Sequence, residues 1–195
     1  MNPALADLER QFESVATSIA SLVDGLTEED LQWRPAEGQW SIVECFDHLN
    51  SAWAVLPKLD RKIAEGRERG LLASGPFRTK ILGQLYIRLV EPPVRVLRVR
   101  APARFRPRTS PPPSEVVPKL VALQGELIGR IRAADGVDLG AITMSSPISR
   151  RFRMTIGQWF AFLAGHERRH LWQAGRVKER LRREGVPYRP PVARA

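Results

Sequence analysis

Apolar residues in the first 26 positions of the chain recur at alternating intervals of three and four. This spacing places them on one stripe of a helix, so one face is buried and the others are polar. The stripe consists of Leu5, Leu8, Phe12, Val15, Ile19, Leu22 and Leu26. We predict a long first helix that stops at Asp24-Gly25, because glycine takes the left-handed cap conformation without steric cost. A short capped turn is expected over residues 27–30.

A second long helix is predicted to begin after Ser41. Ser41 and Glu44 have the spacing of a capping box, and Trp40 stands where a hydrophobic staple begins. Its apolar positions continue the same spacing and are Ile42, Phe46, Leu49, Trp53 and Leu56. We expect this helix to kink or end at Pro57, since proline lacks the amide proton that an inner helical turn needs.

A shorter helix and a long irregular segment are predicted in the middle of the chain. The helix is indicated by one apolar stripe, which consists of Phe77, Ile81, Leu85 and Leu89. It is expected to stop before Pro92-Pro93, because a residue preceding proline is driven away from helical angles. Residues 91–113 then contain seven prolines, and a connection of this length is more often functional or disordered than filler.

Two further long helices follow this segment. Ser114 is expected to cap the third long helix, which ends near Asp135-Gly136. Its apolar positions are Val117, Leu120, Leu123, Leu127 and Ile131. Thr155 and Gln158 form a second predicted capping box, which opens the fourth long helix. One stripe of this helix carries Trp159, Leu163, His166, His170, Val177 and Leu181.

Four long helices without convincing strands predict an all-α fold. The fold rules favour a four-helix bundle, with the Pro/Arg-rich crossover of residues 91–113 between the second and third long helices. A chain of 195 residues fits a single domain over residues 1–195, followed at its end by a basic tail at 185–195. Its 43% hydrophobic and 27% charged residues are typical of a globular protein.

The chain carries no recognisable export or membrane signal. Its first ten residues mix charged side chains with alanine and leucine, and no stretch reaches the 18 or so apolar residues of a membrane span. Cys45 is the single cysteine, so an internal disulfide and a cysteine zinc site are both excluded. We expect a cytoplasmic protein in which Cys45 is a packing residue rather than a reactive thiolate.

The net charge of +10 is concentrated in two segments. Residues 91–113 carry six arginines against one glutamate, and residues 176–195 carry seven basic residues against two glutamates. Each segment therefore contributes +5, and the rest of the chain sums to zero. Interleaved prolines and few aromatic residues disfavour a nucleic-acid groove. A solvated loop and tail, or attraction of an anionic small-molecule substrate, are the two interpretations that stay open.

All three histidines of the chain fall on predicted helices. His166 and His170 are four residues apart, so they differ by roughly 40° around the helix axis and stack one turn apart. His48 flanks the apolar stripe of the second helix. A lone inward histidine is usually a core residue, but a stacked pair is well suited to share a divalent ion. Three protein nitrogens with an open position are the pattern of a catalytic rather than a structural metal site.

Two segments of the chain resemble the DinB/YfiT-like superfamily of four-helix metal-binding proteins. Residues 40–49, WSIVECFDHL, are similar to its W-S-x-x-E-x-x-x-H-L segment, and residues 166–173, HERRHLWQ, to its H-x-x-x-H-x-x-Q segment. Trp33-Arg34-Pro35 and the residues from Ala101 to Pro107 extend the resemblance over nearly the whole chain. It implies a bundle that holds one divalent transition metal, Zn²⁺ or Ni²⁺, with His48, His166 and His170.

The resemblance implies a class of chemistry rather than one reaction. Characterised relatives include S-transferases and isomerases that use a low-molecular-weight thiol, and many others have no assigned activity. Our first hypothesis is therefore an S-transferase or hydrolase in which a metal-bound water or a substrate thiolate reacts. The second is a non-catalytic metal-binding or ligand-sensing bundle, and the third is an electrostatic nucleic-acid binder. A homodimer through an exposed helix face fits each of them.

Residues 166–170, HERRH, also match the H-E-x-x-H signature of zinc proteases, in which the glutamate is the general base. The context disfavours this interpretation, because no histidine follows His170 and no strand is evident to present a substrate. We expect Glu167 to be a solvated partner for an arginine.

Four further residues are candidates for the surroundings of the site: Gln173, Glu44, Arg169 and Trp159. Gln173 lies one turn beyond His170 and is placed to hold a water or a ligand, although an ordinary polar position explains it equally well. The capping box already accounts for Glu44. Arg168 or Arg169 is placed to attract an anionic substrate, and the tryptophans Trp33, Trp53, Trp159 and Trp172 are expected in the core and the pocket wall.

Overall fold

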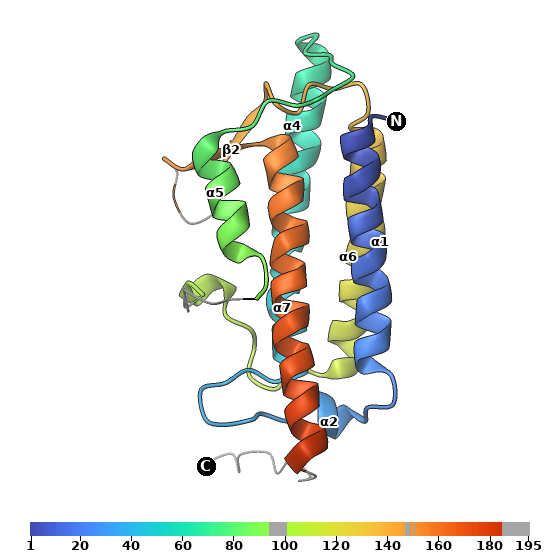
Figure 1. Ribbon diagram of the computed structural model, residues 1–195, viewed down its shortest axis with the longest axis vertical. Coiled ribbons are helices and arrows are strands. Elements are labelled where there is room, and N and C mark those ends of the chain that lie inside the picture. The colour runs from blue at the N-terminus through green and yellow to red at the C-terminus, as the bar shows by residue number, and fades with distance from the viewer. Residues whose placement is uncertain (94–100, 147–148, 150, 185–195) are drawn as a thin grey trace.

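The computed structural model describes residues 1–93, 101–146, 149 and 151–184. Its helices are α1 (Pro3–Val23), α2 (Glu28–Gln32), α3 (Ile42–Asn50), α4 (Leu56–Glu68), α5 (Ile81–Val90), α6 (Pro113–Ala133) and α7 (Ile156–Glu184), with the 3₁₀ turns η1 (Ser51–Val55) and η2 (Ala103–Phe105). Figure 1 shows α1, α4, α6 and α7 running along the long axis of the molecule, with α5 beside α7. The predicted all-α bundle is confirmed.

The bundle is closed by contacts among four helical segments. Helix α1 packs against both α6 and α7, and α3 does the same. Helices α1 and α3 therefore lie diagonally across the bundle from each other, and so do α6 and α7. The predicted stripe of α1 is buried from Leu5 to Ile19. This helix stops at Asp24, and Gly25 follows with a positive φ of 70°, as expected for a left-handed stop.

The second helical segment begins after Ser41 as predicted, but its α-helix ends earlier than predicted. Ser41 and Glu44 form a complete capping box at the start of α3. The α-helix gives way to the 3₁₀ turn η1 at Ser51, six residues before Pro57, which instead occupies the first turn of α4. Proline is tolerated there because first-turn amides have no helical acceptor. The expectation that Pro57 itself ends the helix was therefore wrong.

The short helix α5 exists, but its predicted stripe lies on the solvent side. Ile81 is 87% exposed, while Ile87 and Val90 are buried against the bundle. Gly83 lies so close to α7 that a Cβ atom would come within 2.6 Å of the Gln158 side-chain oxygen. Nearly every position of α5 is apolar, so periodicity could not show which face packs.

Two details near α6 and α7 also differ from the sequence predictions. Helix α6 starts at Pro113, because the fixed φ of proline suits the first helical position. No side chain caps this helix start. Ser114 is therefore not the cap. A two-stranded antiparallel hairpin, β1 (Thr143–Ser145) with β2 (Arg153–Thr155), precedes α7, although no strand was expected. In the described part of the chain, no helix has the length and apolar character needed to cross a membrane.

Glu167 is a core residue and not the solvated partner of an arginine that the sequence suggested. It is 1% exposed, and Gln124 of α6 donates a hydrogen bond to its Oε1 at 3.3 Å. Burial raises the pKa of this carboxyl to about 8, partly offset by the Gln124 hydrogen bond. Residue 167 directly follows His166 in the sequence, and helix periodicity alone could not show that its side chain faces α6.

We expect Glu167→Gln to change how stability depends on pH. The folded chain keeps the proton of Glu167 up to about pH 8, whereas the unfolded carboxyl loses it near its ordinary value of 4.5. The parent therefore loses unfolding free energy as pH rises through this window, and the neutral glutamine does not. Urea unfolding in chelator at several pH values should show the variant gaining on the parent toward pH 8. Glu13→Gln on the exposed side of α1 is the control, and a constant offset between parent and Glu167→Gln would contradict the assignment.

We expect Ser41→Ala to lower the unfolding free energy by about 1 kcal/mol, because the Glu44 amide loses the side-chain acceptor that starts α3. Ser18→Ala is the matched control. Its hydroxyl donates to a carbonyl on the exposed side of α1, and its removal should cost less than about 0.5 kcal/mol. Urea unfolding of both metal-free variants measures the difference. Equal losses would show that the cap does not stabilise α3.

Candidate metal centre

The structure brings the three histidines together. His48 comes from α3, and His166 and His170 come from one side of α7, one turn apart. One ring nitrogen from each histidine lies within 4.8 Å of those of the other two. The Nε2 atoms of His48 and His166 are 3.2 Å apart, and the ring centres of His48 and His170 are 4.5 Å apart. Two helices far apart in sequence thus converge on one point.

Hydrogen bonds on the outer ring nitrogens set the tautomers of two of these histidines. The Nδ1 atom of His48 lies 2.5 Å from the carbonyl oxygen of Phe105, and a carbonyl accepts only, so this nitrogen carries the proton. The Nδ1 atom of His170 lies 3.2 Å from Oε1 of Gln173 and donates to it in the same way. In a neutral ring the remaining Nε2 then carries a lone pair. His48 and His170 therefore present lone pairs rather than protons to the cluster.

Burial keeps all three rings neutral. It lowers the pKa of His48, although the Phe105 carbonyl and the Asp47 carboxylate act in the opposite direction. Burial and the neighbouring His48 lower the pKa of His166 to about 3. His170 has a pKa well below its usual range, first through burial and then through the proximity of His166. The neutral form is the one that binds a metal, so no proton has to leave at neutral pH.

The donor set fits a divalent transition metal. Nitrogens bound at about 2.0–2.1 Å to one tetrahedral ion lie roughly 3.3 Å apart, close to the 3.2 Å between Nε2 of His48 and of His166. Without an ion, His166 can satisfy the His48 lone pair only by donating its own Nε2 proton. A cation replaces that proton and satisfies several lone pairs together. Among the described residues, the cluster consists of three imidazoles with no carboxylate or thiolate, a donor set that suits a divalent transition metal.

Aromatic side chains surround the cluster, and sequence reasoning missed most of them. The ring of Trp40 lies 5.1 Å from His48 and 5.8 Å from His170. The ring of Phe162 stacks on His166 at 5.4 Å, and Tyr86 of α5 stacks on Phe162 in turn. Trp40 was predicted only as a staple, and the one-turn spacing of residues 162 and 166 is the signal that could have identified Phe162.

Three other residues considered from the sequence, Glu44, Cys45 and Trp159, make structural contacts outside the histidine cluster. Glu44 is buried, completes the capping box and forms an ion pair with Arg34. Cys45 is fully buried, and burial raises the pKa of its thiol, as expected for a packing residue. Trp159 is buried and donates to the carbonyl of residue 144, and its ring contacts Phe162 rather than a histidine.

The remaining tryptophans divide between the core and the surface. Trp33 is buried and Trp53 is half-buried against the core. Trp172 is 40% exposed, so the expectation that it lines the core or the pocket was wrong. It lies on the outer side of α7, where the guanidinium of Arg176 stands 5.9 Å from its ring.

The two arginines between the metal-site histidines behave differently. Arg168 forms an ion pair with Glu91 and donates to Gln11 at 2.8 Å, so its charge is engaged. Arg169 donates to the Leu89 carbonyl at 3.3 Å, and burial lowers the pKa of its guanidinium. The positive charge of Arg169 acts on both His166 and His170. Of the two, Arg169 is the cation that lies in the field of the site.

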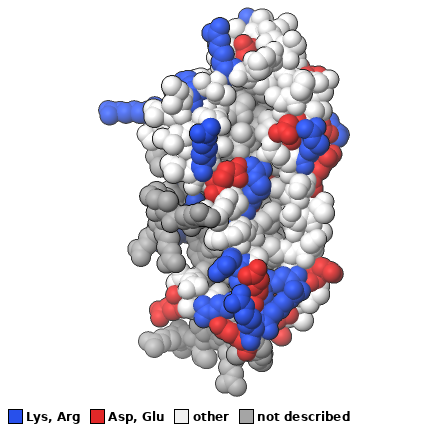
Figure 2. Space-filling view, in the orientation of Figure 1, with Lys and Arg blue, Asp and Glu red and all other residues white. Residues whose placement is uncertain are grey.

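Several charged side chains elsewhere in the described residues form ion pairs. Figure 2 shows Lys and Arg interleaved with Asp and Glu on the face in view. Arg130 contacts Asp60 and Glu126, for example, and Arg132 contacts Glu9. The predicted basic tail at 185–195 lies outside the described residues. Charges of both signs are therefore mixed on this face.

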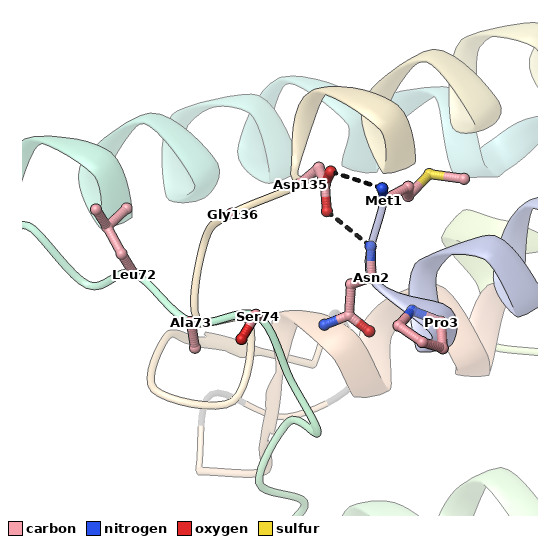
Figure 3. A pocket seen from close by; sticks show the side chains of 8 residues that line it. All are labelled: Met1, Asn2, Pro3, Leu72, Ala73, Ser74, Asp135 and Gly136. Atoms are coloured by element: carbon pink, nitrogen blue, oxygen red, sulfur yellow. Dashed lines mark hydrogen bonds and ion pairs between the residues drawn. The ribbon is translucent and has the colours of Figure 1, made fainter.

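A surface hollow with a volume of about 610 Å³ lies at the N-terminus (Figure 3). It is lined by Met1, Asn2, Pro3, Leu72, Ala73, Ser74, Asp135 and Gly136. Asp135 pairs with the terminal amine and accepts from the Asn2 amide, so its carboxylate is already engaged. No histidine lines it. Donor chemistry, and not the size of a hollow, identifies the candidate site.

Comparisons with known proteins agree with this architecture. Residues 11–174 match the DinB superfamily. The chain is 25% identical over 165 residues to the uncharacterized protein YuaE of Bacillus subtilis, an alignment that covers 82% of this chain and 90% of that protein. No solved structure matches significantly. The family match spans the three histidines and most of the bundle, and the chain belongs to the DinB superfamily.

Proposed function

We propose that this protein is a metal-dependent enzyme of the thiol S-transferase or hydrolase type, acting on a small molecule with one Zn²⁺ or Ni²⁺ held by His48, His166 and His170. The observation that carries the proposal is the convergence of three neutral imidazoles whose nitrogens lie within 4.8 Å of one another. Family membership supports the same ligand set. Three protein ligands leave coordination positions free, which is the pattern of catalytic sites.

The chain's own residues have distinct roles in this proposal. A bound divalent ion supplies Lewis-acid chemistry, which lowers the pKa of a coordinated water or thiol. The Phe105 carbonyl and the Gln173 side chain hold His48 and His170 with their lone pairs toward the ion. The ring of Trp40 lies against His48 and His170 and forms an apolar wall on that side of the cluster. Arg169 provides a positive charge that favours an anionic thiol or substrate.

Proteolysis through the H-E-x-x-H signature is not supported by the position of its glutamate. A general base must reach the water that attacks the substrate. Glu167 instead lies in the core and accepts from Gln124 of α6, on the side of α7 that packs into the bundle. The signature here is a coincidence of two helix-spaced histidines around a structural glutamate.

We expect the parent, purified without chelator or histidine tag, to contain about one divalent metal ion per chain. His48→Ala and the double variant His166→Ala/His170→Ala should lose it while keeping parental far-UV circular dichroism. Elemental analysis of all three proteins, before and after incubation with Zn²⁺ or Ni²⁺, gives the stoichiometry. A parent that stays metal-free after both incubations, or variants that retain the metal, would refute the ligand set.

We expect the metal-loaded parent to catalyse either thiol transfer from glutathione to 1-chloro-2,4-dinitrobenzene or hydrolysis of p-nitrophenyl acetate. Turnover should disappear in His48→Ala. Arg169→Gln should raise KM for the anionic thiol glutathione about tenfold and leave KM for neutral 2-mercaptoethanol unchanged, because only the former pairs with a guanidinium. Arg176→Gln, farther along α7, is the control.

Failure of turnover with a full complement of metal would favour the second candidate, a non-catalytic metal-binding or ligand-sensing bundle. The same convergence of three histidine nitrogens supports that candidate, since an open coordination position binds a ligand whether or not it reacts. Ligand-induced shifts in the absorption spectrum of a Co²⁺-substituted protein would then report binding without reaction.

A further inference from the structure

We infer that Arg108 is a positioning residue for the metal centre: it clamps the segment 101–112 onto α3, so that the Phe105 carbonyl holds His48 in its ligating tautomer. The inference rests on the proposed metal site. It assigns a role to an arginine of the Pro/Arg-rich crossover, which the sequence suggested as a solvated loop or as an attraction for an anionic substrate.

The first contact in the argument joins the segment to a ligand. The Phe105 carbonyl, at the end of the 3₁₀ turn η2, lies 2.5 Å from Nδ1 of His48. This carbonyl belongs to a short turn in an irregular connection rather than to the bundle. An irregular segment keeps an acceptor in place only when something else fixes the segment, because ordering each free residue costs conformational entropy.

The second contact fixes the segment next to the same ligand. The Arg108 amide donates to Oδ2 of Asp47 at 2.8 Å, and its guanidinium donates to Oδ1 of Asp47 at 2.8 Å from Nη2 and 3.2 Å from Nε. The other side of the guanidinium reaches Glu115 in α6, at 3.0 and 3.2 Å. One arginine thus ties the segment to α3 and to α6 through two carboxylates.

The two contacts form a closed ring of neighbouring residues. Asp47 and His48 are adjacent in α3, and Phe105 and Arg108 are three apart in the segment. Each residue of the α3 pair binds one residue of the segment pair, so a slip of the segment by one residue would break both connections. The position of the Phe105 carbonyl is therefore coupled to the Arg108–Asp47 pair.

The chemistry of the position requires arginine. The guanidinium contacts two carboxylates at once through donors that lie in a fixed planar fork, which lysine cannot supply. The other described arginines of the segment have different surroundings. Arg104 lies over the Phe105 ring, at 4.8 Å, and Arg106 donates only to the Ala101 carbonyl, at 3.4 Å. Arg106 is therefore the matched control, with the same charge on the same segment.

We expect Arg108→Gln and Asp47→Asn to weaken Zn²⁺ binding by about 10- to 100-fold, the usual effect of losing a partner that orients a metal-ligating histidine. Arg106→Gln should stay within about twofold of the parent. Competition titrations against a chromophoric chelator measure the affinities, and thermal unfolding of the metal-free proteins checks that each variant is folded. Parental affinity in a folded Arg108→Gln protein would overturn the inference.

A second measurement does not depend on metal binding. In the metal-free parent, long-range ¹⁵N–¹H spectra of the imidazoles should show His48 with its proton on Nδ1 and in slow exchange. Arg108→Gln should shift His48 toward the other tautomer or accelerate the exchange, and Arg106→Gln should not. If the parent binds no metal but His48 responds in this way, the proposed function fails and the clamp stands. If His48 is unchanged in Arg108→Gln, the clamp fails whatever the metal affinity.

Discussion

Three imidazoles that share one small space, two of them buried and that of His166 half-buried, are the constraint on which the rest of this structure depends. Burial keeps the rings neutral, and a neutral ring offers one donor and one lone pair. Where the outer nitrogen donates to Phe105 or Gln173, the lone pair must point inward toward the other rings. The inward-facing ring nitrogens then carry more lone pairs than protons. A divalent cation can bind several of these lone pairs together.

The fold supplies this constraint from separate parts of the chain. Helix α7 presents two rings by its own periodicity, and α3 presents the third because its capping box sets where the helix begins. Residues 101–112, which form the short turn η2 within otherwise irregular backbone, add the carbonyl that contacts His48 and the arginine that we infer fixes that carbonyl. The bundle helices therefore position the three histidines, and the loop that contains Phe105 and Arg108 orients one of them, His48.

Local patterns in the sequence predicted most of the fold and singled out the histidines that the structure brings together. Capping boxes and the spacing of apolar residues act within one helical turn, so Ser41 with Glu44 and the pair His166 and His170 could be recognised without a structure. The resemblance of two segments to one superfamily brought the third histidine, His48, into the same site, and the family match agrees with it.

Contacts between distant residues could not be predicted in this way. Nothing local links Phe105 to His48 or Arg108 to Asp47, because those partners are some 60 residues apart and meet only in the folded chain. The apolar pattern also left open which way some helix positions face. The outward stripe of α5 shows this, as does Glu167, which faces the core.

The most direct test of this account is X-ray absorption spectroscopy at the metal edge of the protein loaded with Zn²⁺. The account predicts about three imidazole nitrogens at roughly 2.0–2.1 Å, with the remaining coordination by light atoms from solvent or buffer. Loss of one imidazole in His48→Ala would assign the α3 ligand. A first shell without imidazole scattering, or one unchanged in His48→Ala, would contradict the central claim that three histidines of two helices hold one metal ion.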